Sequence, residues 1–537
     1  MIAVHHSTIR KVLPVGAAVL LATACSSAAT TGADAGPPRS GGTLTLAVGS
    51  NPDCLDPQQV GTNAALNVGR QLVDSLTDQD SATGEIKPWL AESWETNATS
   101  TSFTFHLRSG ATFSDGTPVD APAVKTSFDG IKALGAKSLL GSGYLAAYTG
   151  STVLDPRTVR LDFSAPSAQF LQASSTMSLG VLAPAAYRKT PDQRCQGDGL
   201  IGSGPFVFES FKQNSELVIA KRKGYAWGSS LWKHQGEAYL DKIDYKIVPE
   251  PGVRTGSLLS GQLDATTEVQ PVDEAQFQGN GFTESTRPNP GVVFNLTANV
   301  TRGVLADEKV RQAVGKGVNR QEVTETVLSP NYKPATSILA STTPLYTNLS
   351  AQLAYDPAGA AALLDGDGWV PGPDGIRTKG GQRLGAKVVF AAAFNQSQSV
   401  LELIQQQLRK VGFDLAIELH TTAETLQIQQ SGAYDFLWYN VTRADPDILR
   451  NQFSAKAGNR SHLPAGTPLD TALDQQAATA DSAARKPGAE QAQQLIVDHA
   501  YAIPVFELTQ VVASSSRAHG VSFEASSRLQ LFDAWVS

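Results

Sequence analysis

Three aspartates lie close together in the C-terminal part of the chain: Asp435, Asp445 and Asp447, with Arg443 among them. Two carboxyl groups at a fixed separation can divide general acid and general base work between them. The sequence offers no spacing that fixes such a pair, and aspartates in loops are more often exposed than catalytic. The cluster therefore supports a secreted hydrolase as one hypothesis, which an activity screen on generic substrates would test.

Other signatures of catalysis do not occur in the sequence. No two histidines have the spacing of metal ligands on a helix, and HExxH, GxSxG and GxxxxGK[ST] are not found. Gly366-Asp367-Gly368 lacks the third glycine of a dinucleotide loop. Asp365–Gly368 departs from a calcium loop because Ile376 stands where that loop needs glutamate. We therefore expect a protein that is not an enzyme and that has no metal site and no cofactor.

The first 24 residues are typical of an export signal. A positively charged start is followed by an apolar run, Val12–Ala24, which is too short to span a membrane. Its small final residues directly before Cys25 resemble a bacterial lipobox, in which the cysteine receives lipid and becomes the new N-terminus. Alternatively, Cys25 is discarded with an ordinary signal peptide. We expect 1–24 to be a signal peptide and the small, polar stretch 25–40 to be a lipid-anchored flexible tether.

The remaining cysteines are Cys54 and Cys195. Outside the cytoplasm an oxidising environment allows a disulfide between them, closing a long loop. The alternative is two unpaired buried thiols. We favour the disulfide, because an unpaired thiol is a liability outside the cell.

The composition indicates a folded body of several domains rather than a disordered chain. The 537 residues include 41% hydrophobic and 17% charged residues, and no further apolar run approaches the length of a membrane span. With 43 Lys+Arg against 50 Asp+Glu, the net charge is −7, and no basic block alternates with aromatic residues. We therefore exclude nucleic acid as the main partner.

Strand and helix patterns are mixed along the whole body. The stretches 41–48, 102–108, 239–249, 291–296, 387–394 and 413–419 alternate as strands. Strand character also covers 153–163, 207–220 and 503–506, while 64–76, 119–131, 252–263, 307–318, 356–364 and 400–411 have helical spacing. This mixture predicts an α/β protein with at least two lobes. Trp89, Phe105 and Phe113 are expected in the core.

The run FTFHLRSGATFSDGTPVDAPAV at Phe103–Val124 resembles a motif of the extracellular solute-binding proteins, family 5. These are the oligopeptide-, dipeptide- and nickel-binding lipoproteins of ABC importers. Further resemblances follow in the family's order: Gly202–Phe206, Tyr239–Ile243, Leu259–Asp264, Val310–Ala313 with Asn319-Arg320, Tyr355–Pro357, Gly368-Trp369 and Gly375–Arg377. The likeness covers about 41–510, and chance matches would not keep this order.

The resemblance implies an α/β fold: a two-lobed clamshell of the periplasmic-binding-protein type (type II, cluster C) with an extra inserted domain. Lobe I would comprise 41–68, 205–290 and 503–537, the inserted domain II 69–204, and lobe III 291–502. The lobes would close over a ligand at the hinge. The implied partners are a short peptide or other small solute and the ABC permease subunits. We expect a monomer, lipid-anchored at the outer face of the cytoplasmic membrane.

Peptide binders of this family hold the peptide's amino group with an aspartate in the segment after Gly-x-Tyr-Asp. That aspartate aligns with Thr442, and the motif's next Asp-Pro aligns with Asp445-Pro446. Either Asp445 substitutes, or Arg443 faces a ligand carboxylate or another anion through its bidentate fork. The candidate ligand residues are Trp438, Tyr439, Asn440, Thr442, Arg443, Asp445, Asn51 and Asp53.

Structural alternatives exist for five of these candidates: core packing for Trp438 and Tyr439, a surface salt bridge for Arg443, and turn formation for Asn51 and Asp53. The preferred function is capture of short peptides for an ABC importer. The Thr442 departure keeps open a non-peptide solute, such as a nickel chelate, an opine, a sugar or an amino acid such as arginine. A hydrolase comes third, and a signalling or structural lipoprotein that has lost transport comes last.

Overall fold

The computed structural model describes residues 36–279, 281–392 and 394–537. The predicted signal peptide, Cys25 and most of the predicted tether lie outside the described residues. The chain divides into two units, Met1–Pro37 and Pro38–Ser537, and all described helices and strands belong to the second. Within the described residues, no helix is both long and apolar enough to cross a membrane.

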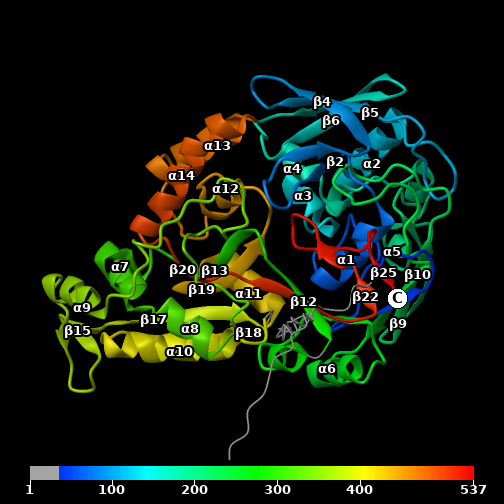
Figure 1. Ribbon diagram of the computed structural model, residues 1–537. Helices are drawn as coiled ribbons and strands as arrows, with labels where there is room; N and C mark the ends of the chain where they lie inside the picture. The colour runs from blue at the N-terminus through cyan, green and yellow to red at the C-terminus, as the bar shows by residue number, and fades with distance from the viewer. Residues whose placement is uncertain (1–35, 280, 393) are drawn as a thin grey trace, which may run out of the picture. The chain divides into compact units, whose positions relative to one another are not determined.

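A seven-stranded mixed sheet gathers strands from both ends of the chain (Figure 1). In spatial order its strands are β12 (Phe282–Pro288), β21 (Thr509–Ser515), β11 (Ala265–Thr267), β1 (Thr43–Val48), β10 (Lys242–Ile247), β9 (Glu216–Lys221) and β8 (Phe206–Lys212). The central strand β1 runs parallel to β10 and β11. Its alternating sequence buries Leu44 and Leu46 completely. Helices α1 (Asn63–Leu72) and α6 (Pro251–Leu259) follow strands of this sheet.

The segment between α1 and β8 forms a four-stranded antiparallel sheet of its own. Its order is β4 (Ala91–Thr96), β5 (Ser102–Leu107), β7 (Thr158–Phe163) and β6 (Tyr148–Asp155). The smaller elements are β2 (Thr77–Gln79), β3 (Ile86–Pro88), α2 (Ala121–Leu134), α3 (Gly141–Tyr144), α4 (Phe170–Ala173) and α5 (Pro191–Cys195). Trp89, Phe105 and Phe113 are at most 2% exposed, which confirms their predicted place in the core.

A five-stranded sheet forms the centre of the third part. Its order is β18 (Asp414–His420), β17 (Gly385–Ala391), β19 (Phe436–Thr442), β13 (Gly291–Ala298) and β20 (Ala502–Phe506). The helices of this part are α7 (Glu308–Gly317), α8 (Arg320–Thr326), α9 (Pro357–Gly366), α10 (Ser397–Lys410), α11 (Thr422–Ser431), α12 (Ile448–Phe453), α13 (Pro468–Ala478) and α14 (Ser482–Asp498). On α10, which matches the helical spacing predicted over 400–411, Leu401, Ile404 and Leu408 share one face and are fully buried.

Two stretches expected to have strand character are hairpins. Residues 153–163 belong to β6 and β7, which pair on either side of Pro156-Arg157, and 207–220 belong to β8 and β9. The alternation continues across each turn, so it does not show where the chain reverses. A small three-stranded sheet is formed by β14 (Val370–Pro371), β15 (Arg377–Lys379) and β16 (Gln382–Arg383). Two short pairs complete the fold: β22 (Ala518–His519) with β25 (Trp535–Val536), and β23 (Ser522–Phe523) with β24 (Leu529–Gln530).

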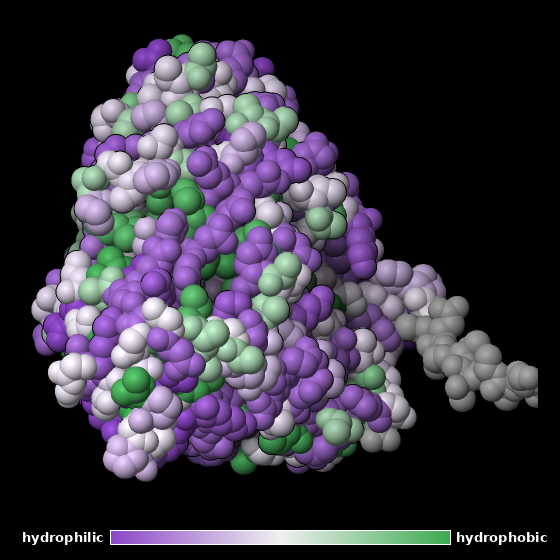
Figure 2. Space-filling model, turned by 90° about the vertical axis from the view of Figure 1, so that its left-hand side faces the viewer, coloured by the Kyte–Doolittle hydropathy of each residue, from purple (hydrophilic) through white to green (hydrophobic). Residues whose placement is uncertain are grey.

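The chain crosses between the two large sheets at two places. The first crossing joins β12 to β13, and the second joins β20 to β21. The predicted division between 502 and 503 falls inside β20, which pairs with β13, whereas β21 pairs with β11 and β12. Figure 2 shows one face of the molecule, on which hydrophilic residues predominate and apolar residues form small separate patches.

Candidate ligand-binding site

A cavity of about 300 Å³ lies between the seven-stranded and five-stranded sheets. From the side of the seven-stranded sheet it is lined by Ser50, Asn63, Glu268, Gln270, Thr509 and Gln510. From the side of the five-stranded sheet it is lined by Phe294, Tyr332, Phe394, Asn395, Gln396 and Asn440. The volume is at the lower end of the range of small-molecule sites, about 300–1,000 Å³.

The cavity is next to both chain crossings. The backbone N–H of Asn289, in the first crossing, donates to the carbonyl of Leu508, in the second, at 2.7 Å, so the two crossings run side by side. Leu508 is also part of the cavity wall. A rotation at these crossings would therefore change the distance between the two sides of the cavity.

Two hydrogen bonds join the opposite sides of the cavity. The Nε2 of Gln396 donates to Oε1 of Gln270 at 2.8 Å. Nearby, the Nδ2 of Asn331 donates to Oε2 of Glu274 at 2.7 Å. On the five-stranded side Gln396 follows β17 and Asn331 follows α8, whereas Gln270 and Glu274 both follow β11 on the seven-stranded side. The structure is thus a conformation in which the two sides are in contact.

The polar part of the wall consists mainly of carboxamides. These side chains are Asn63, Gln270, Asn395, Gln396, Asn440 and Gln510. Each carboxamide offers both a donor and an acceptor without carrying charge. A wall of this kind suits a ligand with alternating N–H and C=O groups.

The apolar part of the wall is an aromatic floor. Phe294 on β13 stacks on Phe506 and on Trp438, with ring centroids 4.8 and 5.2 Å apart, and lies 5.3 Å from Phe394. Tyr332 is 6.1 Å from Phe394. Phe506 and Trp438 do not line the cavity, so they support the floor from behind. Such mutual packing leaves little freedom to the rings that a ligand would contact.

Of the predicted ligand residues on β19, Asn440 lines the cavity. Trp438 is on the same face of the strand, is buried beneath Phe294, and donates from Nε1 to Ser397 Oγ at 3.1 Å. Tyr439 points to the opposite face, as strand alternation requires. There its hydroxyl accepts a bond from Thr297 and its ring lies 4.3 Å from the Arg460 guanidinium.

Thr442 and Arg443 have partners within the protein. The Oγ1 of Thr442 accepts a hydrogen bond from Asn289 Nδ2 at 2.8 Å, beside the first chain crossing. Arg443 is 8% exposed and extends toward the inserted segment. Its Nη1 donates to Gln169 Oε1 at 3.1 Å and its guanidinium lies 4.2 Å from the centre of the Tyr144 ring. Neither residue lines the cavity.

Asp445 forms a buried bidentate ion pair with Arg485 of α14. The Nη1 and Nη2 of Arg485 donate to its two carboxylate oxygens at 2.9 and 2.8 Å, and both side chains are at most 7% exposed. The Asp447 backbone N–H adds a third hydrogen bond to the same carboxylate. Because its charge is already compensated, Asp445 is poorly placed to hold the ammonium of a ligand.

The other two aspartates of the cluster are paired as well. Arg450 donates to both oxygens of Asp447 at 2.7 Å. Asp435 accepts from the backbone of Lys387 at 2.9 Å and forms an ion pair with Arg302 at 3.3 Å. Asp435 precedes β19, whereas Asp445 and Asp447 follow it, so the length of the strand separates Asp435 from the other two.

Asn51 and Asp53 lie in the loop after β1 and outside the cavity wall. The Oδ1 of Asn51 accepts from the backbone N–H of Asn214, in the β8–β9 turn, at 3.1 Å. Asp53 is exposed. Ser50, directly before them, lines the cavity.

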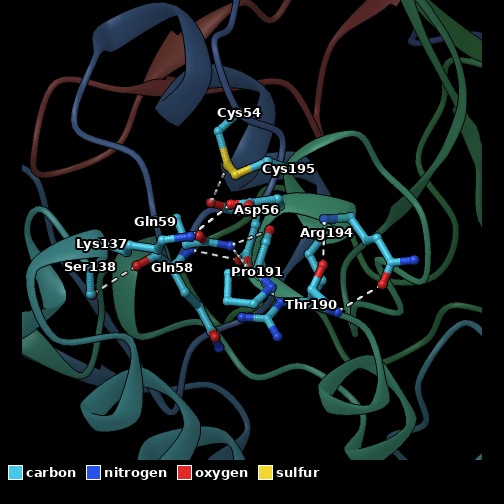
Figure 3. The surroundings of a disulfide bond; sticks show 12 residues. Cys54, Asp56, Gln58, Gln59, Lys137, Ser138, Thr190, Pro191, Arg194 and Cys195 are labelled. Carbon is cyan, nitrogen blue, oxygen red and sulfur yellow. Dashed lines mark hydrogen bonds and ion pairs between the residues drawn. A yellow bond between two sulfur atoms is a disulfide. The ribbon is translucent and has the colours of Figure 1, made fainter.

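Cys54 and Cys195 are joined by a disulfide, and a buried ion pair lies beside it (Figure 3). The Nε of Arg194 donates to Oδ2 of Asp56 at 2.7 Å, and both side chains are at most 3% exposed. Gln59 Nε2 donates to the same oxygen at 2.7 Å. The loop that begins at Ser50 is thus attached to the inserted segment by a covalent bond and by charge.

Sequence reasoning missed most of the wall, including Asn63, Glu268, Gln270, Tyr332 and Gln396. These residues come from segments far apart in the chain, and none carries a motif. One signal was available for Glu268: it directly follows the short buried strand β11, and a charged residue at the end of such a strand often faces a cleft.

The family is decided by a match over residues 85–460 to the model of bacterial extracellular solute-binding proteins, family 5. The chain belongs to this family. It is 26% identical over 383 residues to the nickel-binding periplasmic protein of Escherichia coli K12, covering 68% of this chain and 69% of that protein. It is 25% identical over 501 residues to the probable D,D-dipeptide-binding periplasmic protein DdpA of the same strain, covering 89% and 91%.

The fold is also that of solved relatives. The ABC transporter-associated periplasmic binding protein DppA of Helicobacter pylori, solved with the peptide STSA, superposes with a TM-score of 0.74 at 21% identity. The alignment covers 93% of this chain and 98% of that one. The mixed α/β, periplasmic-binding-protein fold is confirmed. Members of the family are solute-binding proteins rather than enzymes, and this chain is one of these extracellular solute-binding proteins.

Proposed function

We propose that this protein captures short peptides in the cavity between its two large sheets and delivers them to the permease of an ABC importer. The observation that carries the proposal is the wall of six carboxamides above an aromatic floor. The carboxamides match the N–H and C=O groups of a peptide backbone, and they do so without selecting one side chain. The small volume favours peptides of a few residues.

Delivery rests on hinge movement at the two chain crossings, with lobes I and III as rigid parts and 69–204 attached to lobe I. The bonds Gln270–Gln396 and Glu274–Asn331 exist only when the two sides meet, so they favour the closed form. A ligand that contacts both sides stabilises the same form. The permease would then distinguish loaded from empty protein by its closure.

A bare metal ion fits the cavity wall less well than a short peptide does, although one relative is named for nickel. Among the described wall residues there is one carboxylate and no histidine or cysteine, and the described chain holds no cluster of three or more such ligands. Nickel sites favour imidazole ligands. A metal chelate or a sugar would have to use the same carboxamides, and ligand identification separates these cases.

The test is mass spectrometry of the ligand released by denaturing mature protein purified from its own host. We expect masses of short peptides, with the length set by the cavity. A single sugar or metal chelate would contradict capture of peptides while leaving the importer role intact. If no ligand is retained, calorimetry against dipeptides and tripeptides, arginine and nickel replaces the measurement.

The proposed lipid anchor at Cys25 would keep the protein at the outer face of the membrane. One acyl chain alone gives marginal membrane binding, so stable attachment needs more than one chain. Cell fractionation should find the protein with membranes and a Cys25→Ser variant in the soluble or unprocessed fraction. Equal distribution of both forms would contradict lipidation.

A further inference from the structure

The described wall of the cavity contains one charged side chain, Glu268. Lysine, arginine and histidine do not occur among these wall residues. The loop after β11 holds Glu268 at a φ of +56°, a conformation that non-glycine residues rarely adopt. Strain of this kind persists where the surrounding structure fixes a side chain in place.

The carboxylate is fixed mainly by the backbone around it. It accepts a hydrogen bond from Gly49 N–H, and a Cβ at position 49 would come within 2.1 Å of its Oε2. Arg254 Nη2 is 4.0 Å from this oxygen. However, the Arg254 guanidinium donates at 2.8–3.2 Å to the carbonyls of Val248, Pro249 and Glu268, so it is only partly available to the carboxylate.

The charge of Glu268 is therefore incompletely compensated. Burial raises the pKa of the Glu268 carboxyl, and Arg254 and Gly49 N–H oppose that rise without cancelling it. Its situation differs from that of Asp445, which has two short bonds from one arginine. A cationic group of a ligand in the cavity would supply the positive charge that the protein itself does not place next to Glu268.

The facing side of the cavity also suits a cation. The rings of Phe294, Tyr332 and Phe394 present π-systems whose faces carry negative potential. Glu274, on the same side as Glu268 and close enough to raise the pKa of Tyr332, adds a further negative charge. The cavity thus combines one carboxylate, an aromatic floor and neutral amides.

We propose that Glu268 and this aromatic floor select ligands by a cationic group, an ammonium or a guanidinium, placed between them. The group can be the amino terminus of a peptide or a lysine or arginine side chain. This inference rests on the proposed peptide function. Glu268 would thus make the contact with the cation. Thr442 cannot make this contact because it carries no negative charge, and Asp445 is already paired with Arg485.

The test measures affinity by calorimetry for four tripeptides: trialanine, N-acetyl-trialanine, Ala-Lys-Ala and N-acetyl-Ala-Lys-Ala. For the wild-type protein, we expect N-acetyl-trialanine, which has no cation, to bind at least about 10-fold more weakly than trialanine or the lysine peptides. Glu268→Gln should abolish this difference. Glu402→Gln removes one exposed carboxylate on α10 and should retain it.

The acetylated peptides identify the source of the cation. If N-acetyl-Ala-Lys-Ala binds as tightly as Ala-Lys-Ala, the side chain supplies it, and if it binds as weakly as N-acetyl-trialanine, the amino terminus does. Thermal unfolding of each variant verifies that it folds. Wild-type protein that binds N-acetyl-trialanine, the one peptide without a cation, as tightly as the other three, or a Glu268→Gln variant that still discriminates against it, overturns the selection alone. Wild-type protein that binds none of the four overturns the proposed peptide function and the inference with it.

Discussion

Two loops of this protein carry acidic side chains near the cleft, Asp445 buried and Glu268 partly exposed, and they differ in what faces the carboxylate. Asp445, after β19, receives both arms of the Arg485 guanidinium, whereas Glu268, after β11, has its nearest guanidinium nitrogen at 4.0 Å and faces a cavity. The first arrangement neutralises charge inside the fold. The second leaves the negative charge of Glu268 available to a ligand that enters the cavity. An acidic side chain near a cleft is therefore informative only when its partners are known.

The largest expected effect comes from breaking the internal pair. Arg485→Met leaves Asp445 buried and unpaired, and we expect a loss of about 3–5 kcal/mol in the free energy of unfolding. Urea denaturation measures this loss. The matched control is Arg383→Met, because Arg383 pairs with Asp374 and Asp414 at the surface, where about 1 kcal/mol or less is expected. Equal losses in the two variants would show that Asp445 finds another partner or water.

A third acidic residue sharpens the comparison, because its hydrogen-bond donors are neutral. Asp74 is fully buried and accepts from Tyr225 OH at 3.1 Å and from Trp227 Nε1 at 2.9 Å. Burial raises its pKa from 3.8 to about 7, although Trp227, Arg70, Tyr225 and Arg222 oppose the rise. In the folded protein the protonated form is thus favoured below about pH 7.

Because the pKa of Asp74 is raised in the folded protein, the contribution of Asp74 to stability should fall as the pH rises. Below pH 3.8 Asp74 is protonated in both states and its contribution to stability is complete; it is lost as the pH rises to about 7. An Asp74→Asn variant does not titrate. Its stability relative to wild type should rise by about 1.4 kcal/mol per pH unit from pH 5 to 7 and level off above. Denaturation at several pH values measures the slope, and a flat difference would mean that Asp74 stays ionised.

Local patterns were sufficient for most elements. Alternation located β1, β5 and β18, and the helical spacing of 400–411 located α10. The ordered motifs from Phe103 onward indicated the family and with it the fold. These features depend on residues close together in the sequence, and their periodicity follows directly from strand and helix geometry.

The cavity could not be predicted in the same way. Its wall draws on loops after β1, β11 and β17, on the second crossing, and on β13 and β19, so no local pattern describes it. The partners of charged residues raise the same difficulty: Arg485 lies 40 positions after Asp445, and nothing in either segment marks the pair. Motif alignment therefore led to Thr442–Asp445, while the uncompensated charge lies on Glu268.

The smallest expected effect concerns two neighbours on β19. Asn440 faces the cavity and Tyr439 faces the other way, toward Thr297 and Arg460. Removing one hydrogen-bonding carboxamide by Asn440→Ala should weaken binding of trialanine by about 3- to 10-fold and change stability little. Tyr439→Phe removes only a hydroxyl on the opposite face, so it should cost about 1 kcal/mol of stability and leave affinity unchanged.

Calorimetry and urea denaturation of both variants make the two effects separable. An equal loss of affinity in Tyr439→Phe and Asn440→Ala would mean that the ligand depends on side chains from both faces of β19. Because neighbouring side chains of a strand point to opposite faces, a ligand held in this cavity cannot contact both, so this result would contradict the proposed site. Loss of affinity confined to Asn440→Ala would place the ligand against the same face of β19 as Trp438. It would then lie on the aromatic floor and within reach of the carboxylate that the fold leaves uncompensated.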